Sequence, residues 1–156
     1  MAINYGKKFE KKFEEDFLKI PGALVYRLPD QMSGYKNVSK NPCDYICYRF
    51  PNILFIECKV VQYGNTLALS RITQLDKLSV YAKYKGSKAG VVAFFMEKKK
   101  VIFIPVQTLL DIVKDGKHKS VNIRFLESGE YELIDIPSKL RRVFLDSDYS
   151  ILLEET

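Results

Sequence analysis

The feature that most constrains the fold is a pair of adjacent segments rich in β-branched and aromatic residues. They span residues 43–50 and 53–60, with a Pro-Asn pair between them. Short runs of this composition, bounded by turn residues, are typical of β-strands, so the pair predicts a β-hairpin. In an antiparallel pair the numbers of facing residues have a constant sum. A turn between the two segments therefore places Asp44 roughly opposite Glu57.

The second strand of this predicted hairpin ends in charged residues. Residues 53–56 are an unbroken apolar run, and Glu57, Cys58 and Lys59 follow it directly. Side chains alternate between the faces of a strand, so Glu57 and Lys59 share one face and Cys58 points to the other. A buried charge must be paired, titrated or bound to a metal, which leaves two interpretations open. One is a Glu–Lys ion pair at a strand end. The other is a Mg²⁺ site with oxygen ligands from Asp44 and Glu57, since Mg²⁺ needs only one or two carboxylates beside waters and substrate phosphates.

Residues 4–20 are predicted to form the first helix. Its apolar stripe repeats every four residues, at Phe9, Phe13 and Phe17, and a Pro-Gly pair follows its end. We interpret the stripe as core packing. Glu10 lies on a neighbouring face, where it is either a solvated helix residue or a third carboxylate near the hairpin. The lysines around it would line an approach to phosphates if this face meets DNA, and they are Lys7, Lys8, Lys11 and Lys12.

The rest of the chain predicts a mixed α/β protein. Its apolar patterns predict strands at residues 23–28, 90–96, 101–104, 121–125 and 131–134, and helices at 69–84 and 106–114, with a final short helix from Ser138. Gln74 is a polar residue near the apolar face of the 69–84 helix. The predicted fold class is therefore α/β, with a mixed central β-sheet flanked by helices.

Composition narrows the class of protein. A length of 156 residues suits one domain, residues 1–156, and 47% apolar content fits a globular core. No run approaches the roughly 20 apolar residues of a membrane span, and no apolar leader precedes residue 4, so we expect a cytoplasmic protein. A formal net charge of +6 favours a polyanionic partner.

The three cysteines have no disulfide-framework spacing and are predicted to be reduced thiols. A zinc site made by Cys43, Cys47 and the lone His118 is an alternative, for which no fourth ligand is evident.

Residues 29–41 are a long polar loop by pattern. Long loops within compact domains are often functional, although a mobile surface connection is the simpler interpretation. In the functional interpretation the loop probes the substrate, with Lys36 and Lys40 on phosphates and Tyr35 stacked on a base.

Taken in order, these residues resemble the PD-(D/E)xK nuclease superfamily, and within it the RecU-type Holliday junction resolvases, including small phage-encoded versions. The resemblance covers about residues 4–110. It rests on a Gly-x-x-Phe-Glu motif that ends at Glu10, the segments 40–45 and 55–59, and Ile72-x-Gln74.

The resemblance implies a restriction-endonuclease-like core and a homodimeric endonuclease that resolves four-way DNA junctions by paired symmetric cuts. It implies Mg²⁺ or Mn²⁺ as cofactor, no small-molecule cofactor, no membrane, and a place in the cytoplasm, or the host-cell cytoplasm for a phage protein. Residues 29–41 stand where the family has a stalk that enters the junction. Residues from about 117 form a C-terminal extension that either packs under the sheet or mediates dimerisation.

The expected site combines the residue argument with this resemblance. Asp44, Glu57 and the Cys58 carbonyl would hold the metal, with Glu10 as a further ligand through a water. Lys59 would orient the attacking water or stabilise the developing charge. Gln74 would orient the water or a ligand. The residues expected to bind DNA are Lys7, Lys8, Lys11, Tyr35, Lys36 and Lys40.

Three alternatives stay open on the sequence. The chain is a nuclease of the same superfamily that acts on linear duplex DNA, a non-catalytic DNA-binding module with the same fold, or a structural protein whose charged residues only form ion pairs.

Overall fold

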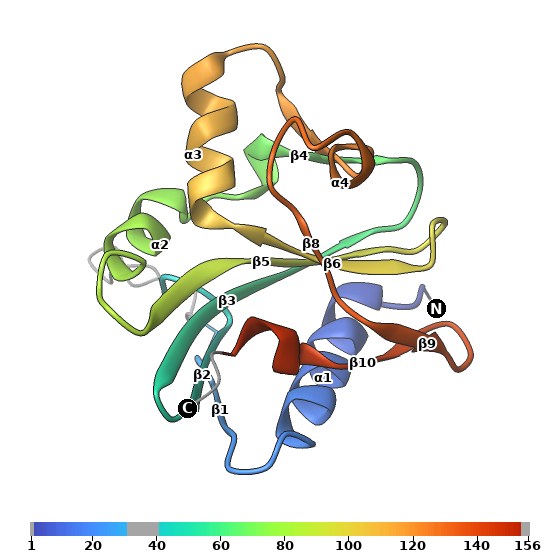
Figure 1. Ribbon diagram of the computed structural model, residues 1–156. Helices are drawn as coiled ribbons and strands as arrows, with labels where there is room; N and C mark the ends of the chain where they lie inside the picture. The colour runs from blue at the N-terminus through green and yellow to red at the C-terminus, as the bar shows by residue number, and fades with distance from the viewer. Residues whose placement is uncertain (1, 31–40, 154–156) are drawn as a thin grey trace.

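A six-stranded mixed sheet forms the centre of the structure, a computed structural model that describes residues 2–30 and 41–153 (Figure 1). The strand order is β1-β2-β3-β5-β6-β8, in which β3 and β5 run parallel and every other neighbouring pair is antiparallel. Helices flank the sheet on both faces. The predicted class, a mixed central sheet between helices, is confirmed.

The strands of this sheet are β1 (Leu24–Arg27), β2 (Tyr45–Arg49), β3 (Asn52–Val61), β5 (Ser87–Phe95), β6 (Lys100–Pro105) and β8 (Ile134–Asp135). Two small antiparallel pairs accompany it, β4 (Thr66–Ala68) with β7 (Ser120–Asn122) and β9 (Ser138–Leu140) with β10 (Leu145–Ser147). The helices are α1 (Tyr5–Leu18), α2 (Leu75–Tyr81), α3 (Val106–Asp115) and α4 (Phe125–Ser128), with 3₁₀ turns η1 (Leu69–Arg71) and η2 (Tyr149–Leu152).

The predicted hairpin is present with the predicted register. Tyr45 faces Ile56 and Arg49 faces Asn52, so facing residues in β2 and β3 have the constant sum expected for a turn at residues 50–51. Extended by one residue, the same register brings Asp44 opposite Glu57. The first strand of the sheet, β1, pairs with the outer edge of β2.

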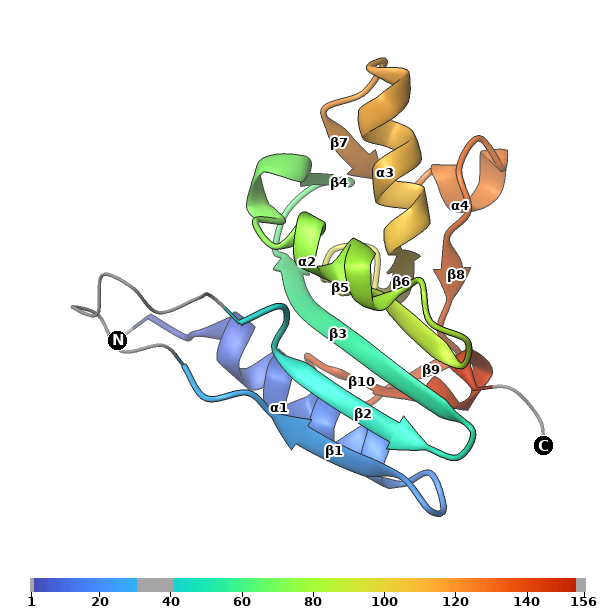
Figure 2. The ribbon, with the colours of Figure 1, turned by 90° about the vertical axis from the view of Figure 1, so that its left-hand side faces the viewer.

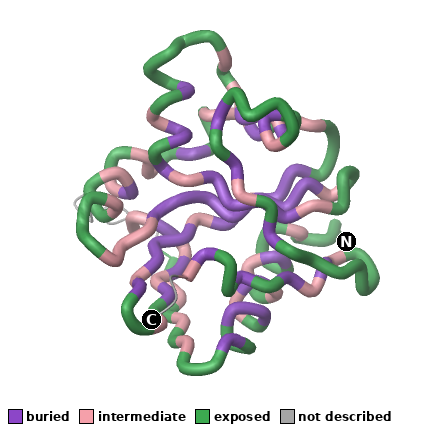
Figure 3. Tube along the Cα trace, in the orientation of Figure 1, coloured by how far each residue is buried: buried purple, intermediate pink, exposed green. Residues whose placement is uncertain are grey.

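Helix α1 covers one face of the sheet. Asn4 caps it by accepting a hydrogen bond from the Lys7 amide at 3.1 Å. The phenylalanine stripe is fully buried, as predicted, and the Phe13 ring lies 5.2 Å from Tyr45 and 4.8 Å from Tyr149. The opposite face carries α2 and α3. Figure 3 shows the resulting pattern, with the central strands buried and the outer connections exposed.

The C-terminal segment differs from its prediction. Instead of a helix from Ser138, residues 138–147 form the β9–β10 hairpin, and η2 follows. The cause is tertiary. The buried Asp16 carboxylate on α1 accepts a hydrogen bond from the Ser147 amide at 3.0 Å, and Tyr149 packs among the α1 phenylalanines. This part of the extension therefore packs on the core, while its role in dimerisation stays a prediction.

The predicted helix at 69–84 is correct only in its second half. Residues 66–68 pair with β7, residues 69–71 form η1, and α2 begins at Leu75. The Leu69 amide donates to the Lys119 carbonyl at 3.0 Å, so a hydrogen bond from another part of the chain replaces a helical one. The weak strand predictions nearby are shifted as well, because Phe125 begins α4 and the last sheet strand starts only at Ile134.

The remaining predicted elements are present within a few residues of their expected bounds. They are α1, β1, β5, β6 and α3, and Pro105 immediately precedes α3. No helix in the described ranges is both long enough and apolar enough to cross a membrane.

Phe13 gives a test of this packing. Because Phe13 is completely buried between the sheet and η2, we expect Phe13→Ala to lower the free energy of unfolding by about 3–5 kcal/mol. Urea denaturation followed by circular dichroism measures this change. Tyr63→Ala, at a side chain that is 79% exposed, is the control and should change stability little. Equal losses in the two variants would contradict the packing described.

Candidate active site

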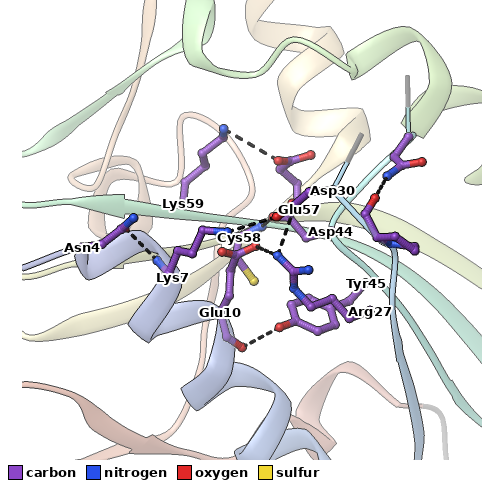
Figure 4. Close-up of polar contacts among 12 residues, drawn as sticks. Asn4, Lys7, Glu10, Arg27, Asp30, Asp44, Tyr45, Glu57, Cys58 and Lys59 are labelled. Atoms are coloured by element: carbon purple, nitrogen blue, oxygen red, sulfur yellow. Dashed lines mark hydrogen bonds and ion pairs between the residues drawn. The ribbon is translucent and has the colours of Figure 1, made fainter. Parts of the chain in front are cut away.

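Asp44 is held in place by main-chain hydrogen bonds on both sides. Its amide donates to the Ile56 carbonyl at 3.0 Å, and its carbonyl accepts from the Leu28 amide at 2.9 Å. Its carboxylate Oδ2 accepts from the Cys58 amide at 2.8 Å (Figure 4). The carboxylate therefore lies against the main chain of β3, directly beside Glu57.

Glu57 and Lys59 share one face of β3, as predicted. Lys59 Nζ lies 3.7 Å from Glu57 Oε1, and the two side chains are only 23% and 15% exposed. The predicted cluster of two carboxylates and one ammonium is thus present at the end of β2 and the middle of β3.

The surroundings of Asp44 and Glu57 are unfavourable for two negative charges. Burial, then the negative charge of Asp44 and a hydrogen bond with its carboxyl group, raises the pKa of Glu57 to about 7, and Lys59 only partly opposes this. Two carboxyl groups that share a site cannot both ionise freely, so one holds its proton unless a cation is near. The arrangement favours binding of a positive ion.

Glu10 approaches this pair from α1. The Tyr45 hydroxyl donates to the Glu10 main-chain carbonyl at 3.0 Å, and Arg27 Nη2 lies 3.7 Å from the Glu10 carboxylate. Burial raises the pKa of Glu10, and the negative charge of Asp44 raises it further because the two carboxylates repel each other. Across the described residues no three side chains of His, Cys, Asp or Glu are arranged to hold a metal ion, so these three acids do not form such a set. A contact of Glu10 through a water stays a prediction.

The Cys58 thiol points to the opposite face, as predicted. It is buried in the cluster under α1 with Phe9 and Ile56, and burial raises the pKa of the Cys58 thiol well above its usual value. The thiol is therefore protonated and unreactive. The Cys58 amide donates to the Asp44 carboxylate, so the Cys58 main chain lies next to Asp44. That the Cys58 carbonyl binds a metal stays a prediction.

Gln74 immediately precedes α2, which packs over the sheet face that carries Glu57. Its carbonyl accepts the Leu78 amide at 3.0 Å, and its side chain is half-buried. No hydrogen bond joins its side chain to the acid pair within the described ranges, so its role stays a prediction.

Arg71 is a residue near the site that the sequence did not indicate. It lies in η1, and its Nη1 donates to the Val60 carbonyl at 3.0 Å, so a guanidinium lies next to the strand end that carries Lys59. Its position depends on the turn that replaces the first half of the predicted helix, and a helical pattern gives no signal for it.

The candidate DNA-binding lysines of α1 separate into two groups. Lys7 and Lys11 line a groove of about 340 Å³ with Glu10 and Arg27, and Lys7 contacts Asp30 at 3.1 Å. Lys8 lines a second, larger groove described below. Three further candidates, Tyr35, Lys36 and Lys40, lie outside the described residues.

Lys12 is not available as an approach lysine. Its Nζ lies 2.8 Å from Asp16 and 2.5 Å from Asp146, so it joins α1 to the β10 strand. The expectation that Lys12 meets phosphates is therefore wrong, because two carboxylates already neutralise it.

The second groove, of about 480 Å³, joins α1 to the β9–β10 hairpin. Lys8 and Lys12 line it from the helix, and Arg141, Arg142 and Phe144 line it from the hairpin. Arg141 is 70% exposed and reaches Asp146 only at 3.7 Å, and Arg142 has no acidic partner among the described residues. The sequence did not indicate this basic groove, because its two sides are more than 100 residues apart along the chain.

The zinc alternative is wrong. His118 contacts Glu130 at 2.9 Å and packs edge-on against Phe125 and Tyr131. Cys47 in β2 and Cys43 just before that strand are buried free thiols, and no zinc-type group of side chains occurs in the described ranges.

Comparisons with known proteins give limited similarity. No protein-family profile matches the chain, and no curated protein sequence matches it. Among solved structures the chain is similar to Hjc, a Holliday junction resolvase from the archaeal hyperthermophile Archaeoglobus fulgidus. The identity is 24%, the match covers 66% of this chain and 78% of that chain, and the TM-score is 0.49. At this level the likeness leaves the function to be argued from the site itself.

The raised pKa of Glu57 predicts a pH dependence of stability. Its folded-state pKa of about 7 exceeds the ordinary 4.5, so this group stabilises the metal-free fold most below pH 4.5. That contribution falls as the pH rises towards 7, by about 3 kcal/mol at roughly 1.4 kcal/mol per pKa unit. We expect Glu57→Gln to remove most of this loss.

Urea unfolding in EDTA at pH 5 and pH 8 measures the difference. Glu15→Gln, at an exposed position on α1, is the matched control and should keep the pH dependence of the original chain. The same slope in Glu57→Gln as in the control would contradict the electrostatic argument.

Proposed function

We propose that this chain is a metal-dependent endonuclease that resolves four-way DNA junctions by paired, symmetric phosphodiester hydrolysis in a homodimer. The observation that carries the proposal is the acid pair: Asp44 and Glu57 lie side by side on one sheet face, half-buried, with Lys59 as their close cation. Lys7 and Lys11 on α1 line a groove together with Glu10. The choice of branched DNA as substrate rests on the resemblance to RecU-type resolvases, whose motifs occur here in the same order.

The donor set suits Mg²⁺ or Mn²⁺. Asp44 and Glu57 offer hard carboxylate oxygens, and the Cys58 carbonyl adds a third oxygen from the same strand, while the Cys58 thiol faces away. Such ions accept one or two carboxylates and fill their remaining positions with waters and phosphate oxygens. When bound, the ion would polarise the scissile phosphate and lower the pKa of a bound water.

The protein side chains then do the positioning. Lys59 has an ammonium next to the acid pair and stabilises negative charge that develops on the phosphate. Glu10, on the neighbouring helix, takes a water, and Gln74 orients the water or a ligand from the start of α2.

The basic surface supports a DNA substrate. Lys7 and Lys11 lie in the groove that contains Glu10, and Lys8 lies with Arg141 and Arg142 in the neighbouring groove across α1. A duplex arm that leaves the acid pair would cross this helix and meet cations along both sides of it. Lys36, Lys40 and Tyr35 lie outside the described residues, and contacts from them to DNA stay a prediction from the sequence.

The geometry of the ion pair argues against the purely structural alternative, in which Glu57 and Lys59 form only an ion pair. At 3.7 Å the contact is long, and one ammonium faces two carboxylates. The pKa of Glu57 stays raised, by burial and by Asp44, in the presence of Lys59. The pair therefore leaves negative charge uncompensated, which is unfavourable for a structural role and suits an ion site.

Asp44→Asn tests the metal role. We expect it to lower the cleavage rate of a labelled four-way junction in Mg²⁺ by about 10³-fold or more, because it removes a carboxylate ligand and leaves the surface cations in place. Junction binding should persist. Asp76→Asn, at an exposed residue in the first turn of α2, is the control and should cleave like the original chain.

The assay includes the matched linear duplex and a sample in EDTA. Paired nicks confined to the junction and lost in EDTA are the expected result. Equal cutting of the duplex would replace the resolvase with a general duplex nuclease, and full activity of Asp44→Asn would contradict the metal site.

Arg141→Ala combined with Arg142→Ala tests the basic groove. If each arginine meets a phosphate, the slope of log affinity against log salt should fall by about two. Lys114→Ala, at the exposed end of α3, is a control with one cation removed elsewhere. Fluorescence anisotropy with a labelled junction at several salt concentrations measures the slope. An unchanged slope in the double variant would place the DNA elsewhere.

A further inference from the structure

One face of the β1–β2 part of the sheet is not covered by any described element. Helix α1 packs behind these strands, and α2 reaches only as far as β3 on the other side, so β1 and β2 face the viewer without a helix in Figure 2. These strands pair antiparallel, and antiparallel strands often leave one face in water, where the side chains are usually polar. An apolar face at this place would therefore call for an explanation.

The side chains on this face are apolar. Leu24 lies opposite Tyr48 across β1 and β2, and Tyr26 lies opposite Ile46. Leu24 is 56% exposed, Tyr26 54% and Tyr48 42%. Phe50 continues the alternating series into the turn and is 69% exposed.

The same surface continues to α2. Ile46 faces Phe55 in the next strand, and the Tyr81 ring stacks on Phe55 with centroids 4.6 Å apart. Tyr84 follows α2 and is 67% exposed. We call this surface the β1–β2 apolar face, and it comprises Leu24, Tyr26, Tyr48, Phe50, Tyr81 and Tyr84.

The size of this face is that of an interface. An aromatic side chain can bury about 150–250 Å², so six side chains that are roughly half exposed offer on the order of 600 Å². This reaches the largest apolar patches that monomers expose and approaches the roughly 800 Å² per partner of a standard interface.

We infer that a second copy of this chain covers the β1–β2 apolar face in a two-fold symmetric dimer. A two-fold interface places a surface against itself, so it must be self-complementary. An uncharged apolar face meets this condition, whereas the basic grooves of α1 would repel their own copies. Aromatic residues are enriched and charged residues depleted at the centres of protein interfaces, which matches this face.

A stacking platform for unpaired bases is the alternative occupant. Such platforms combine aromatic side chains with cations that follow the nucleic-acid backbone. None of the six residues of the face is basic, and Leu24 offers no ring, so a protein partner fits better.

The inference deepens the proposed function and rests on it for its purpose. Asp44 and Glu57 occupy the next row on the same sheet face, beside the row of Ile46 and Phe55. A dimer through this face would therefore place an acid pair at the edge of the interface on each of the two copies. Two symmetric cuts in one junction need such an arrangement.

Sedimentation velocity and light scattering on the full chain test the inference. We expect a dimer at micromolar concentration and a dissociation constant raised roughly 100-fold or more in Leu24→Lys combined with Tyr48→Lys, because each substitution buries like charges across the axis. Leu140→Lys is the matched control: Leu140 is 57% exposed, on β9, against 56% for Leu24. Phe50→Lys is a second, independent variant at the other end of the face.

Monomers in Leu24→Lys/Tyr48→Lys and Phe50→Lys, with unchanged circular dichroism and a dimeric control, would support the inference. A monomeric original chain, or a dimer that survives both variants, would overturn it. Loss of junction binding in Phe50→Lys without any change of mass would assign the face to DNA instead. The cleavage assay is separate: a monomer that cuts junctions refutes only the interface, and a dimer without Mg²⁺-dependent cutting refutes only the nuclease.

Discussion

The register between β2 and β3 is the constraint on which the candidate site depends. It puts Asp44 opposite Glu57, and the main chain of both strands then fixes the Asp44 carboxylate against the Cys58 amide. A shift by one residue would turn Glu57 into the core under α1 and bring the Cys58 thiol to the acid face. The phenylalanines of α1 and the apolar side chains Leu54 and Ile56 oppose that shift, because they would have to leave the core. Packing on one face of the sheet thus specifies the chemistry on the other.

That chemistry is unfavourable for the isolated fold. Burial and the charge of Asp44 raise the pKa of Glu57. Ionising both carboxyl groups therefore lowers the free energy of unfolding, and the packing of the α1 core offsets this loss. A site that binds a cation gains from such a pair, since the uncompensated charge supplies the attraction. The same uncompensated negative charge therefore lowers the stability of the fold and supports the proposed function.

The local sequence pattern predicted correctly those parts of the structure whose conformation depends mainly on their own residues. The hairpin register, the α1 stripe of Phe9, Phe13 and Phe17, and the strands β5 and β6 all follow from periodicity and turn residues. The predictions were wrong where distant groups decide. Leu69 bonds to Lys119 in place of a helical partner, and Ser147 bonds to Asp16 on α1. The basic groove of Arg141 and Arg142, and Arg71 beside β3, depend on those same long-range contacts. No local pattern could have indicated them.

The two faces of β1 and β2 together link assembly to chemistry. On the covered face, Tyr45 and Cys47 pack under α1 with almost no exposure. On the open face, Asp44 leads directly into a row of apolar side chains that ends at the edge strand. In a monomer this arrangement would be unfavourable. The apolar side chains would be exposed to water, and the acid pair beside them would keep uncompensated negative charge. A second copy on that face would bury the apolar row and leave each acid pair at the rim, where a phosphate can still reach it.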